Sequence, residues 1–255
     1  MKYIQPVNSE EREFCRHIAD LISIGSKSGM PKFSGFLTER EQQLAQIQSD
    51  IAKVECFFWG GHGEAVRRMF CSQKAEPEDF PLEAVTFIQP SSYARSGKDM
   101  LSHRDFLGAL MSLGIKRDQI GDIAVSGEGA VVFASQNVLP LILDEISKIG
   151  RVGVRSERGI KIALPRQKFE EIFLAVSSLR IDAIISGVCG LSRDRAASLI
   201  RSGGTVVNGI EISSSSANLE EGDVFSVKGY GKFVFSDLGS LTKKGKTHVT
   251  IKKYI

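Results

Sequence analysis

The chain has 255 residues, of which 42% are hydrophobic and 25% charged, and its formal net charge is +3. This composition is typical of a folded protein and allows one large domain or two to three small ones. No run approaches the roughly 18 apolar residues of a membrane-spanning helix, and the first residues lack the basic-then-apolar order of a secretion signal. We therefore expect a soluble, cytoplasmic protein that does not act at a membrane.

The four cysteines are far apart in the sequence. None forms a Cys-x-x-Cys pair, and none has a histidine at the spacing of metal ligands. We expect reduced, structural thiols, no metal site and no cofactor. The cysteines are Cys15, Cys56, Cys71 and Cys189.

Residues 1–82 are expected to form an N-terminal α/β domain. Apolar residues at helical spacing from Phe14 to Ile22 predict a helix that ends near Gly25 to Gly29. Thr38 and Glu41 fit a capping box that opens a second helix. The segment VECFFWGGHGEAVRRMF, residues 54–70, predicts a strand, a glycine turn and a further helix.

Residues 83–168 show a regular alternation of element types. The order is strand, helix, two strands joined by a hairpin, helix and strand, which is the βαββαβ plan of ferredoxin-like and RNA-recognition folds. The strands are expected at 84–90, 120–126, 130–135 and 159–165, and the helices at 103–114 and 137–150. Classical RNA-recognition strands carry exposed aromatic residues that stack on bases. Phe87 and Phe133 are the candidates here, and strand alternation favours a core position for both.

The last section, residues 178–255, begins with two short helices. Ile181, Ile184, Ile185 and Val188 form the buried stripe of the first, which Ser177 or Ser178 is expected to cap and Gly190 to end. Ser192 is expected to cap the second. Asn208-Gly209 predicts a tight hairpin, because both residues tolerate positive φ. Strand-like sequence follows at 223–235 and 247–255, so we expect an α+β protein of three small domains.

The basic excess of the chain lies in this last section. From Arg180 to Ile255, eleven Lys and Arg residues stand against seven Asp and Glu, which leaves the rest of the chain close to neutral. Arg193 and Arg201 lie on one flank of the apolar stripe of the second helix, and Arg195 lies toward the other. Such a surface suits a polyanion. The alternative is a solvated helix face on which Asp194 neutralises an arginine.

The order of motifs in this section resembles the S-four RNA-binding domain. The matching motifs are Arg-Ile-Asp at 180–182, Leu-Ser-Arg at 191–193, Ile-Arg-Ser-Gly-Gly at 200–204, Val-Asn-Gly at 207–209, Gly222-Asp223 and Ser-Val-Lys-Gly at 226–229. The resemblance implies two helices and a hairpin that grip structured RNA. The RNA contacts that it implies are Arg180, Ser192, Arg193, Arg201, Asn208, Lys228 and, more weakly, Lys232. Asn208 has a second possible role, which is only to shape the turn.

The resemblance extends upstream. The segments WGGHGEAVRRMF, 59–70, and HRDFLGALMSLGIKRDQIGDI, 103–123, are similar to a bacterial family of ribosome-associated S-four proteins with an N-terminal domain and an RNA-recognition-like middle domain. This similarity implies a monomeric factor of ribosome-associated quality control that binds ribosomal RNA or tRNA on a large subunit carrying peptidyl-tRNA. Secondary RNA contacts are possible at His103, Arg104, Lys116 and Arg117, for which a capping and surface role is the alternative.

Two other classes of function remain open. S-four domains also occur in RNA-modifying enzymes of the pseudouridine synthase or methyltransferase type, although no acid, base and nucleophile converge in the preceding residues. A protein-interaction scaffold linked to cell division is the third possibility, because members of the similar family lie in cell-division gene neighbourhoods. We expect a protein that is not an enzyme.

Overall fold

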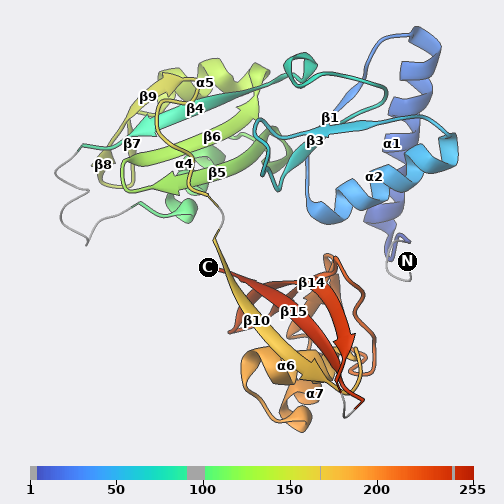
Figure 1. The fold of residues 1–255 in the computed structure, drawn as a ribbon. Coiled ribbons are helices and arrows are strands. Elements are labelled where there is room, and N and C mark those ends of the chain that lie inside the picture. Colours follow the sequence, from blue (N-terminus) through green and yellow to red (C-terminus); the bar gives the residue numbers. More distant parts are fainter. Residues whose placement is uncertain (1–4, 91–100, 167, 243–244) are drawn as a thin grey trace. The chain divides into compact units, whose positions relative to one another are not determined.

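The computed structural model describes residues 5–90, 101–166, 168–242 and 245–255. The chain divides into two compact units, Met1–Arg166 and Gln167–Ile255. Six α-helices and several sheets lie within the described residues (Figure 1). The expected α+β composition is therefore present. Within the same residues, no helix has the length and apolar character to cross a membrane.

The first unit begins with two capped helices beside a three-stranded sheet. The Asn8 side chain accepts the Glu11 N–H at the start of α1, and Thr38 and Glu41 form the predicted capping box of α2. The sheet has the order β1-β3-β2. The elements are α1 (Ser9–Ser28), β1 (Phe33–Leu37), α2 (Glu39–Ala52), β2 (Phe57–Trp59) and β3 (Arg68–Cys71).

The helix predicted within residues 60–70 is wrong, because this segment is a loop followed by the central strand β3. Met69 and Cys71 point into one apolar cluster and Phe70 into another, so β3 is buried on both faces. A strand covered on both faces shows no alternation of apolar and polar residues, and a short apolar run of this kind cannot be distinguished from a helix by its pattern.

The rest of the first unit has the predicted βαββαβ order. Its four-stranded antiparallel sheet has the strand order β5-β6-β4-β9. The main elements are β4 (Leu82–Ile88), α4 (His103–Ser112), β5 (Ile120–Ser126), β6 (Gly129–Ser135), α5 (Leu139–Glu145) and β9 (Arg155–Arg158). The small elements are 3-10 helices η1 (Pro77–Asp79), η2 (Arg117–Gln119) and η3 (Gln136–Val138), and strands β7 (Lys148–Ile149) and β8 (Val152–Gly153).

Two predicted boundaries in this part need correction. The closing strand is the polar segment β9, not the apolar segment 159–165, where Ile162 and Leu164 instead pack beside the cluster that joins the two sheets. An edge strand with polar residues gives no apolar signal. The second helix ends at Glu145, and the small strand β7 replaces its predicted last turn.

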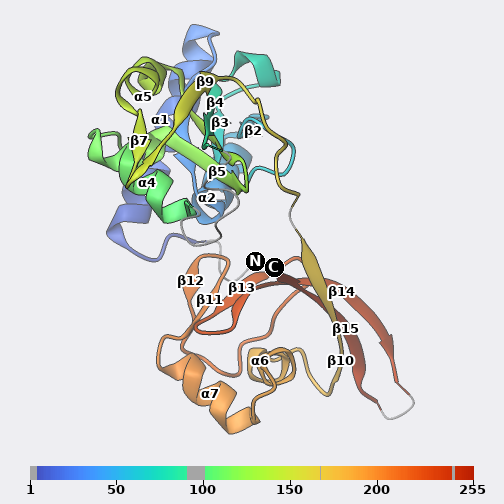
Figure 2. The ribbon, with the colours of Figure 1, turned by 90° about the vertical axis from the view of Figure 1, so that its left-hand side faces the viewer.

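The second unit is a six-stranded sheet with two helices on one face (Figure 2). Its strand order is β10-β15-β14-β13-β11-β12, and all pairs are antiparallel. Phe225, Phe233 and Ile251 are buried on the helix side, and their neighbours along the strands are partly exposed on the other. The elements are β10 (Phe169–Val176), α6 (Ile181–Cys189), α7 (Arg193–Arg201), β11 (Thr205–Val207), β12 (Ile210–Glu211), β13 (Val224–Val227), β14 (Gly231–Leu241) and β15 (Thr247–Tyr254).

No element was expected at residues 169–176, which form the edge strand β10 of this second sheet. The sequence of β10, FEEIFLAV, includes two glutamates and two exposed phenylalanines, so its apolar pattern is weak. The expected division of residues 1–168 at position 82 stays a prediction. An apolar cluster shared by Phe36, Met69, Val131 and Phe133 packs the two sheets of the first unit together. All four cysteines are free thiols in the structure.

Candidate nucleic-acid interface

Helix α6 begins at Ile181, with Arg180 as its N-cap residue, and no serine caps it. The N–H groups of Ile181 and Asp182 donate to the carbonyls of Ala217 and Ser215, at 2.7 and 3.4 Å. These backbone carbonyls take the donors that a serine side chain would have capped, so the predicted role of Ser177 or Ser178 is wrong. Residues distant in the sequence supply the cap, which local sequence cannot reveal.

The start of α7 follows the prediction. Gly190 adopts the left-handed conformation at the end of α6, and the Ser192 hydroxyl accepts the Arg195 N–H at 3.3 Å. Ser192 therefore fixes the first turn of the helix that carries Arg193. A contact between Ser192 and RNA stays a prediction.

Arg180 and Arg193 converge on one buried carboxylate. Nε and Nη2 of Arg180 donate to the two oxygens of Asp182 at 3.2 and 2.7 Å, and Nη2 of Arg193 lies 3.6 Å from Oδ1. The Asp182 side chain is 7% exposed, whereas those of Arg180 and Arg193 are 40% and 51% exposed. The partner of these arginines is therefore Asp182 and not the suggested Asp194.

The electrostatics of this cluster favour an anion. The hydrogen bonds from Arg180 lower the pKa of Asp182 against the opposing effect of its burial, so the carboxylate is ionised at neutral pH. Two guanidinium groups against one carboxylate leave a net charge of +1 at the surface. Arg180 uses two of its five N–H donors on Asp182, and the others remain for a further acceptor.

A further lysine lies near this cluster. Lys246 and Arg193 line the same hollow of about 230 Å³, together with Ser177 and Ser186. Sequence reasoning missed both Lys246 and the pairing role of Asp182. The Arg-Ile-Asp spacing at a helix start was the available signal for Asp182, whereas Lys246 comes close only through the strand pairing of β14 and β15.

The other end of α7 has a second set of cations. Arg201 is the exposed last residue of the helix. Gly203 and Gly204 follow it and line an open groove of about 550 Å³, which Lys228 and Lys232 also line. The Lys232 ammonium lies 5.0 Å from the centroid of the Tyr254 ring, a cation–π distance.

Asn208 has the structural role that was its alternative. Its φ is +49°, as the predicted hairpin requires. The side-chain amide donates to Asp223 Oδ1 at 2.7 Å, and its oxygen accepts the Val224 N–H at 3.0 Å. Asn208 thus ties the hairpin to β13, and its contact with RNA stays a prediction.

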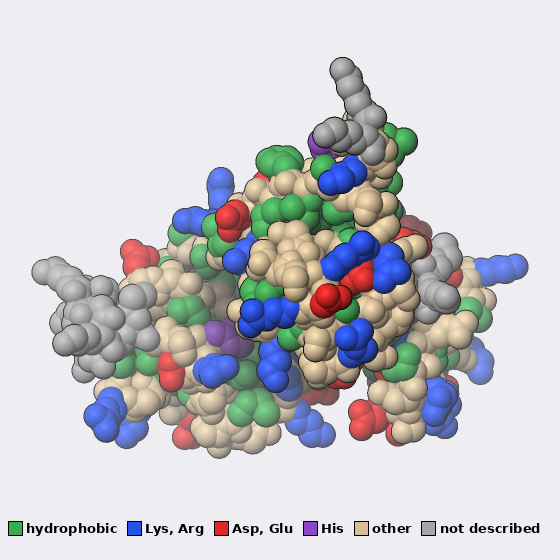
Figure 3. Space-filling view, turned by 90° about the horizontal axis from the view of Figure 1, so that it is seen from below, with side chains coloured by type: hydrophobic (Ala, Val, Ile, Leu, Met, Phe, Trp, Pro, Cys, Tyr) green, Lys and Arg blue, Asp and Glu red, His purple; other side chains and the backbone are tan. Residues whose placement is uncertain are grey.

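The cations of the second unit fall into two groups, which line separate hollows. Figure 3 views the molecule from the side of α6 and α7, and Lys and Arg side chains surround a few acidic ones there. The structure thus groups Arg180 with Arg193 at one end of α7, and it groups Lys228 with Lys232 beside the groove that follows Arg201. It does not confine all predicted contacts to one spot.

The four secondary candidates behave differently from one another. His103, Arg104 and Lys116 are exposed near the start of α4 and η2, whereas Arg117 is half-buried. The Arg117 Nη1 donates to the carbonyls of Ile120 and Gly121, and burial lowers the pKa of Arg117 to about 10. Partial desolvation and the charge of Arg117 lower the pKa of His103.

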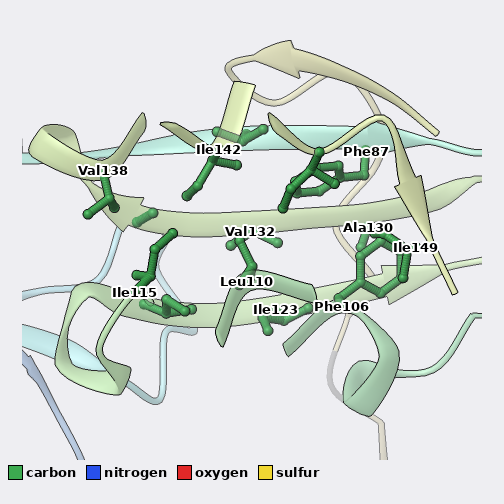
Figure 4. Packing of buried hydrophobic residues seen from close by; sticks show 14 of the residues in the cluster. Phe87, Phe106, Leu110, Ile115, Ile123, Ala130, Val132, Val138, Ile142 and Ile149 are labelled. Atoms are coloured by element: carbon green, nitrogen blue, oxygen red, sulfur yellow. The ribbon is translucent and has the colours of Figure 1, made fainter. Parts of the chain in front are cut away.

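The aromatic candidates of the middle strands belong to the core. Phe87 packs with Phe106 and the apolar residues of α4 and α5 (Figure 4). Phe133 lies on the opposite sheet face, is 1% exposed and stacks on the His62 ring at 4.8 Å between centroids. The preference for a core position is confirmed, and neither ring can stack on a base.

The chain matches one protein-family model in part and one named protein over nearly its whole length. Residues 76–161 match the family model described as "Putative RNA-binding domain in YlmH". The matched range contains the whole βαββαβ segment. Over 98% of its length, the chain is 28% identical to 97% of the Bacillus subtilis (strain 168) "Ribosome-associated protein quality control protein P2".

A solved structure is also similar. "Cell division protein ylmH from Streptococcus pneumoniae" aligns with a TM-score of 0.51 and 22% identity, over 60% of this chain and 93% of that chain. At this identity the similarity concerns the fold alone.

Proposed function

We propose that the chain is a non-enzymatic RNA-binding protein that acts on the ribosome in the cytoplasm. In this proposal it binds, as a monomer, the large subunit with peptidyl-tRNA during quality control. The observation that carries the proposal is the set of exposed cations at both ends of α7, among them Arg193 and Arg201. RNA phosphates are the natural acceptors for such a set.

The comparisons support the choice of RNA and the ribosome. The Bacillus subtilis relative is named for ribosome-associated quality control, and the family matched by residues 76–161 is described as RNA-binding. The similarity to that relative extends over nearly the whole chain, so it includes the cationic helices as well as the middle segment.

The domain assignment is part of the proposal. We assign residues 1–82 to an N-terminal α/β domain, 83–168 to an RNA-recognition-like domain and 178–255 to an S-four domain. The strand order β5-β6-β4-β9 supports the second assignment, and the α6–α7 pair followed by a hairpin supports the third. Because its inner aromatic residues are buried, the middle domain would contact RNA by shape, or contact protein, rather than by base stacking.

The proposed mechanism is positional. Arg180, Arg193 and Arg201 pair with phosphates, for which the planar guanidinium suits bidentate contact. Asp182 holds two of these side chains in place before RNA arrives, which lowers the conformational entropy lost on binding. The protein would then hold a tRNA or subunit conformation without making or breaking covalent bonds.

The decisive test is cosedimentation with large ribosomal subunits. The double variant Arg193→Glu with Arg201→Glu replaces two exposed cations by anions, and we expect it to abolish cosedimentation at moderate salt. The matched control is Arg12→Glu with Arg16→Glu, which makes the same charge change on exposed positions of α1. Retained cosedimentation of the first variant would reject this face.

Two controls test whether the variant is misfolded and whether the protein modifies RNA. Arg193→Gln with Arg201→Gln avoids placing a new carboxylate near Asp182, and its circular dichroism should match that of the parent chain. Incubation with ribosomal RNA, followed by nucleoside mass spectrometry, should reveal no new modification. A modified nucleoside would favour the RNA-modifying enzyme instead.

A further inference from the structure

The glycine-rich groove beside β13 and β14 has the features of a nucleotide site. Its lining is Gly203, Gly204, Val206, Ser226, Val227, Lys228, Gly229, Tyr230, Gly231 and Lys232. Two lysines and no carboxylate belong to this lining, so the groove is cationic. Its volume of about 550 Å³ is within the range of small-ligand sites.

Four glycines line the groove, and their backbone positions do not favour side chains at three of them. Gly229 and Gly231 adopt φ of +85° and +118° in the turn between β13 and β14, which other residues rarely adopt. A side chain at Gly203 would collide with the Glu211 carboxylate, and one at Gly204 with Leu199. The sequence Lys-Gly-Tyr-Gly-Lys thus places Tyr230 between Lys228 and Lys232 in the lining of the groove.

Strand pairing sets the floor of the groove. Val206 is paired with Ser226, and Ser226 with Lys232, so the three side chains share the sheet face that carries no helix in the described structure. The contact with the Tyr254 ring holds the Lys232 ammonium near this row. Since Glu211 lies against Gly203, a phosphate is expected on the side of the two lysines rather than on that of the glycine pair.

We propose that this groove binds one unstacked nucleotide of a single-stranded RNA segment, with the base stacked on Tyr230 and the phosphate between Lys228 and Lys232. An aromatic ring beside a cationic groove is the arrangement by which proteins bind single strands without sequence preference. This inference rests on the proposed function, because the groove begins two residues after Arg201. It adds a base-stacking contact to a surface otherwise described by phosphate contacts.

The test uses the full chain and a fluorescein-labelled decauridine, with binding measured by fluorescence anisotropy. Tyr230→Ser should weaken binding about tenfold, as expected for the loss of one stacked base. Tyr230→Phe keeps the ring and should stay within twofold of the parent. Phe173→Ser is the matched control, because Phe173 is an aromatic residue of the same unit, is 72% exposed and lies outside the groove. It should also stay within twofold.

A crosslinking experiment locates the contact. Decauridine containing 4-thiouridine is irradiated with the protein, and tryptic peptides are mapped by mass spectrometry. Cleavage after Lys228 and Lys232 isolates residues 229–232, where the crosslink is expected. Equal affinity of Tyr230→Ser and the parent, or crosslinks that exclude 228–232, would overturn the groove proposal.

The two proposals fail separately. If Tyr230→Ser binds decauridine as the parent does while Arg193→Glu with Arg201→Glu loses the large subunit, only the groove assignment falls. If the latter variant still cosediments, the proposed helical face falls, and the groove is then judged by the oligonucleotide alone.

Discussion

Arginines occupy two contrasting environments in this protein. In the second unit, Arg193 and Arg201 are exposed on α7, and Arg193 makes a 3.6 Å ion pair with Asp182 and a 3.5 Å contact with Ser178. In the first unit, the Arg67 guanidinium donates to the carbonyls of Phe36, Ile120 and Arg117 at 2.7, 3.2 and 3.4 Å. Burial is the main cause of its lowered pKa.

This difference shows that arginine content alone does not mark an RNA surface. Arg67 and Arg117 join the loop before β3 to the turn before β5, and their donors are used inside the fold. Arg193 and Arg201 keep donors at the surface, where a phosphate can accept them. The acceptor that each guanidinium already has is therefore the feature that separates a structural arginine from a binding one.

The largest expected effect follows from removing a structural arginine. Arg67→Met leaves carbonyls near Phe36 and Ile120 without their donor, and we expect a loss of about 3 kcal/mol in the free energy of unfolding of the first unit. Trp59 is the single tryptophan of the chain and lies in this unit, so its fluorescence during urea unfolding reports on that unit. A change below about 1 kcal/mol would contradict the structural role.

A smaller effect is expected for Asp182→Asn in the second unit. Its carboxylate is buried but its partners are half-exposed, so solvent screens the pair and the expected loss of stability is about 1–2 kcal/mol. Hydrogen exchange of the amides of α6 measures it. The variant should also steepen the salt dependence of RNA binding, because the carboxylate that partly neutralises Arg180 and Arg193 is removed.

The stabilisation that the Asp182 carboxylate gives to the fold depends on pH in a definite direction. Arg180 lowers the pKa of Asp182 in the folded state below that of the unfolded chain. The stabilisation is therefore complete above about pH 4 and is lost as the pH falls through the folded pKa. The stability gap between the parent and Asp182→Asn should close below that range, and a gap that persists in strong acid would exclude the ion pair as its cause.

A binding arginine should affect affinity and not stability. Arg201→Gln is expected to change the free energy of unfolding by less than about 0.5 kcal/mol. It should reduce the slope of log affinity against log salt by about 0.9, the value for one lost phosphate contact. An unchanged slope would remove Arg201 from the interface.

The smallest effect concerns a thiol of α6. Burial raises the pKa of Cys189 to about 11, although Lys253 opposes the shift. At pH 8 only about 0.1% is thiolate, so alkylation by iodoacetamide should be far slower than that of free cysteine. Peptide mapping measures the rate, which should rise with pH up to about 11 if the fold persists.

Local signals predicted much of the fold correctly. The capping box at Thr38 and Glu41, the Ser192 cap and the Asn208-Gly209 turn depend on neighbouring residues, and all three are present. The predictions failed where distant residues decide the structure. Met69 and Phe70 lie in a strand because two apolar clusters cover it, and α6 starts without a serine cap because residues 215–217 supply its carbonyl acceptors.

In the candidate site too, neighbouring residues allowed correct predictions and distant residues did not. Charge asymmetry and motif order directed attention to α6 and α7, and the exposed positions of Arg193 and Arg201 followed from helical periodicity. The convergence of Arg180 and Arg193 on Asp182, and the nearby position of Lys246, required the folded chain. For Asn208 the resemblance implied an RNA contact, and the structure shows that its side-chain amide bonds to Asp223 and Val224 within the fold.

The most direct test of the central claim is ultraviolet crosslinking in cells followed by sequencing of the attached RNA. The account predicts enrichment of large-subunit ribosomal RNA and tRNA, with crosslinked peptides from residues 180–232. It also predicts loss of that enrichment in Arg193→Glu with Arg201→Glu but not in Arg12→Glu with Arg16→Glu. Equal enrichment in both variants, or no ribosomal RNA or tRNA above background, would contradict the assignment of this surface.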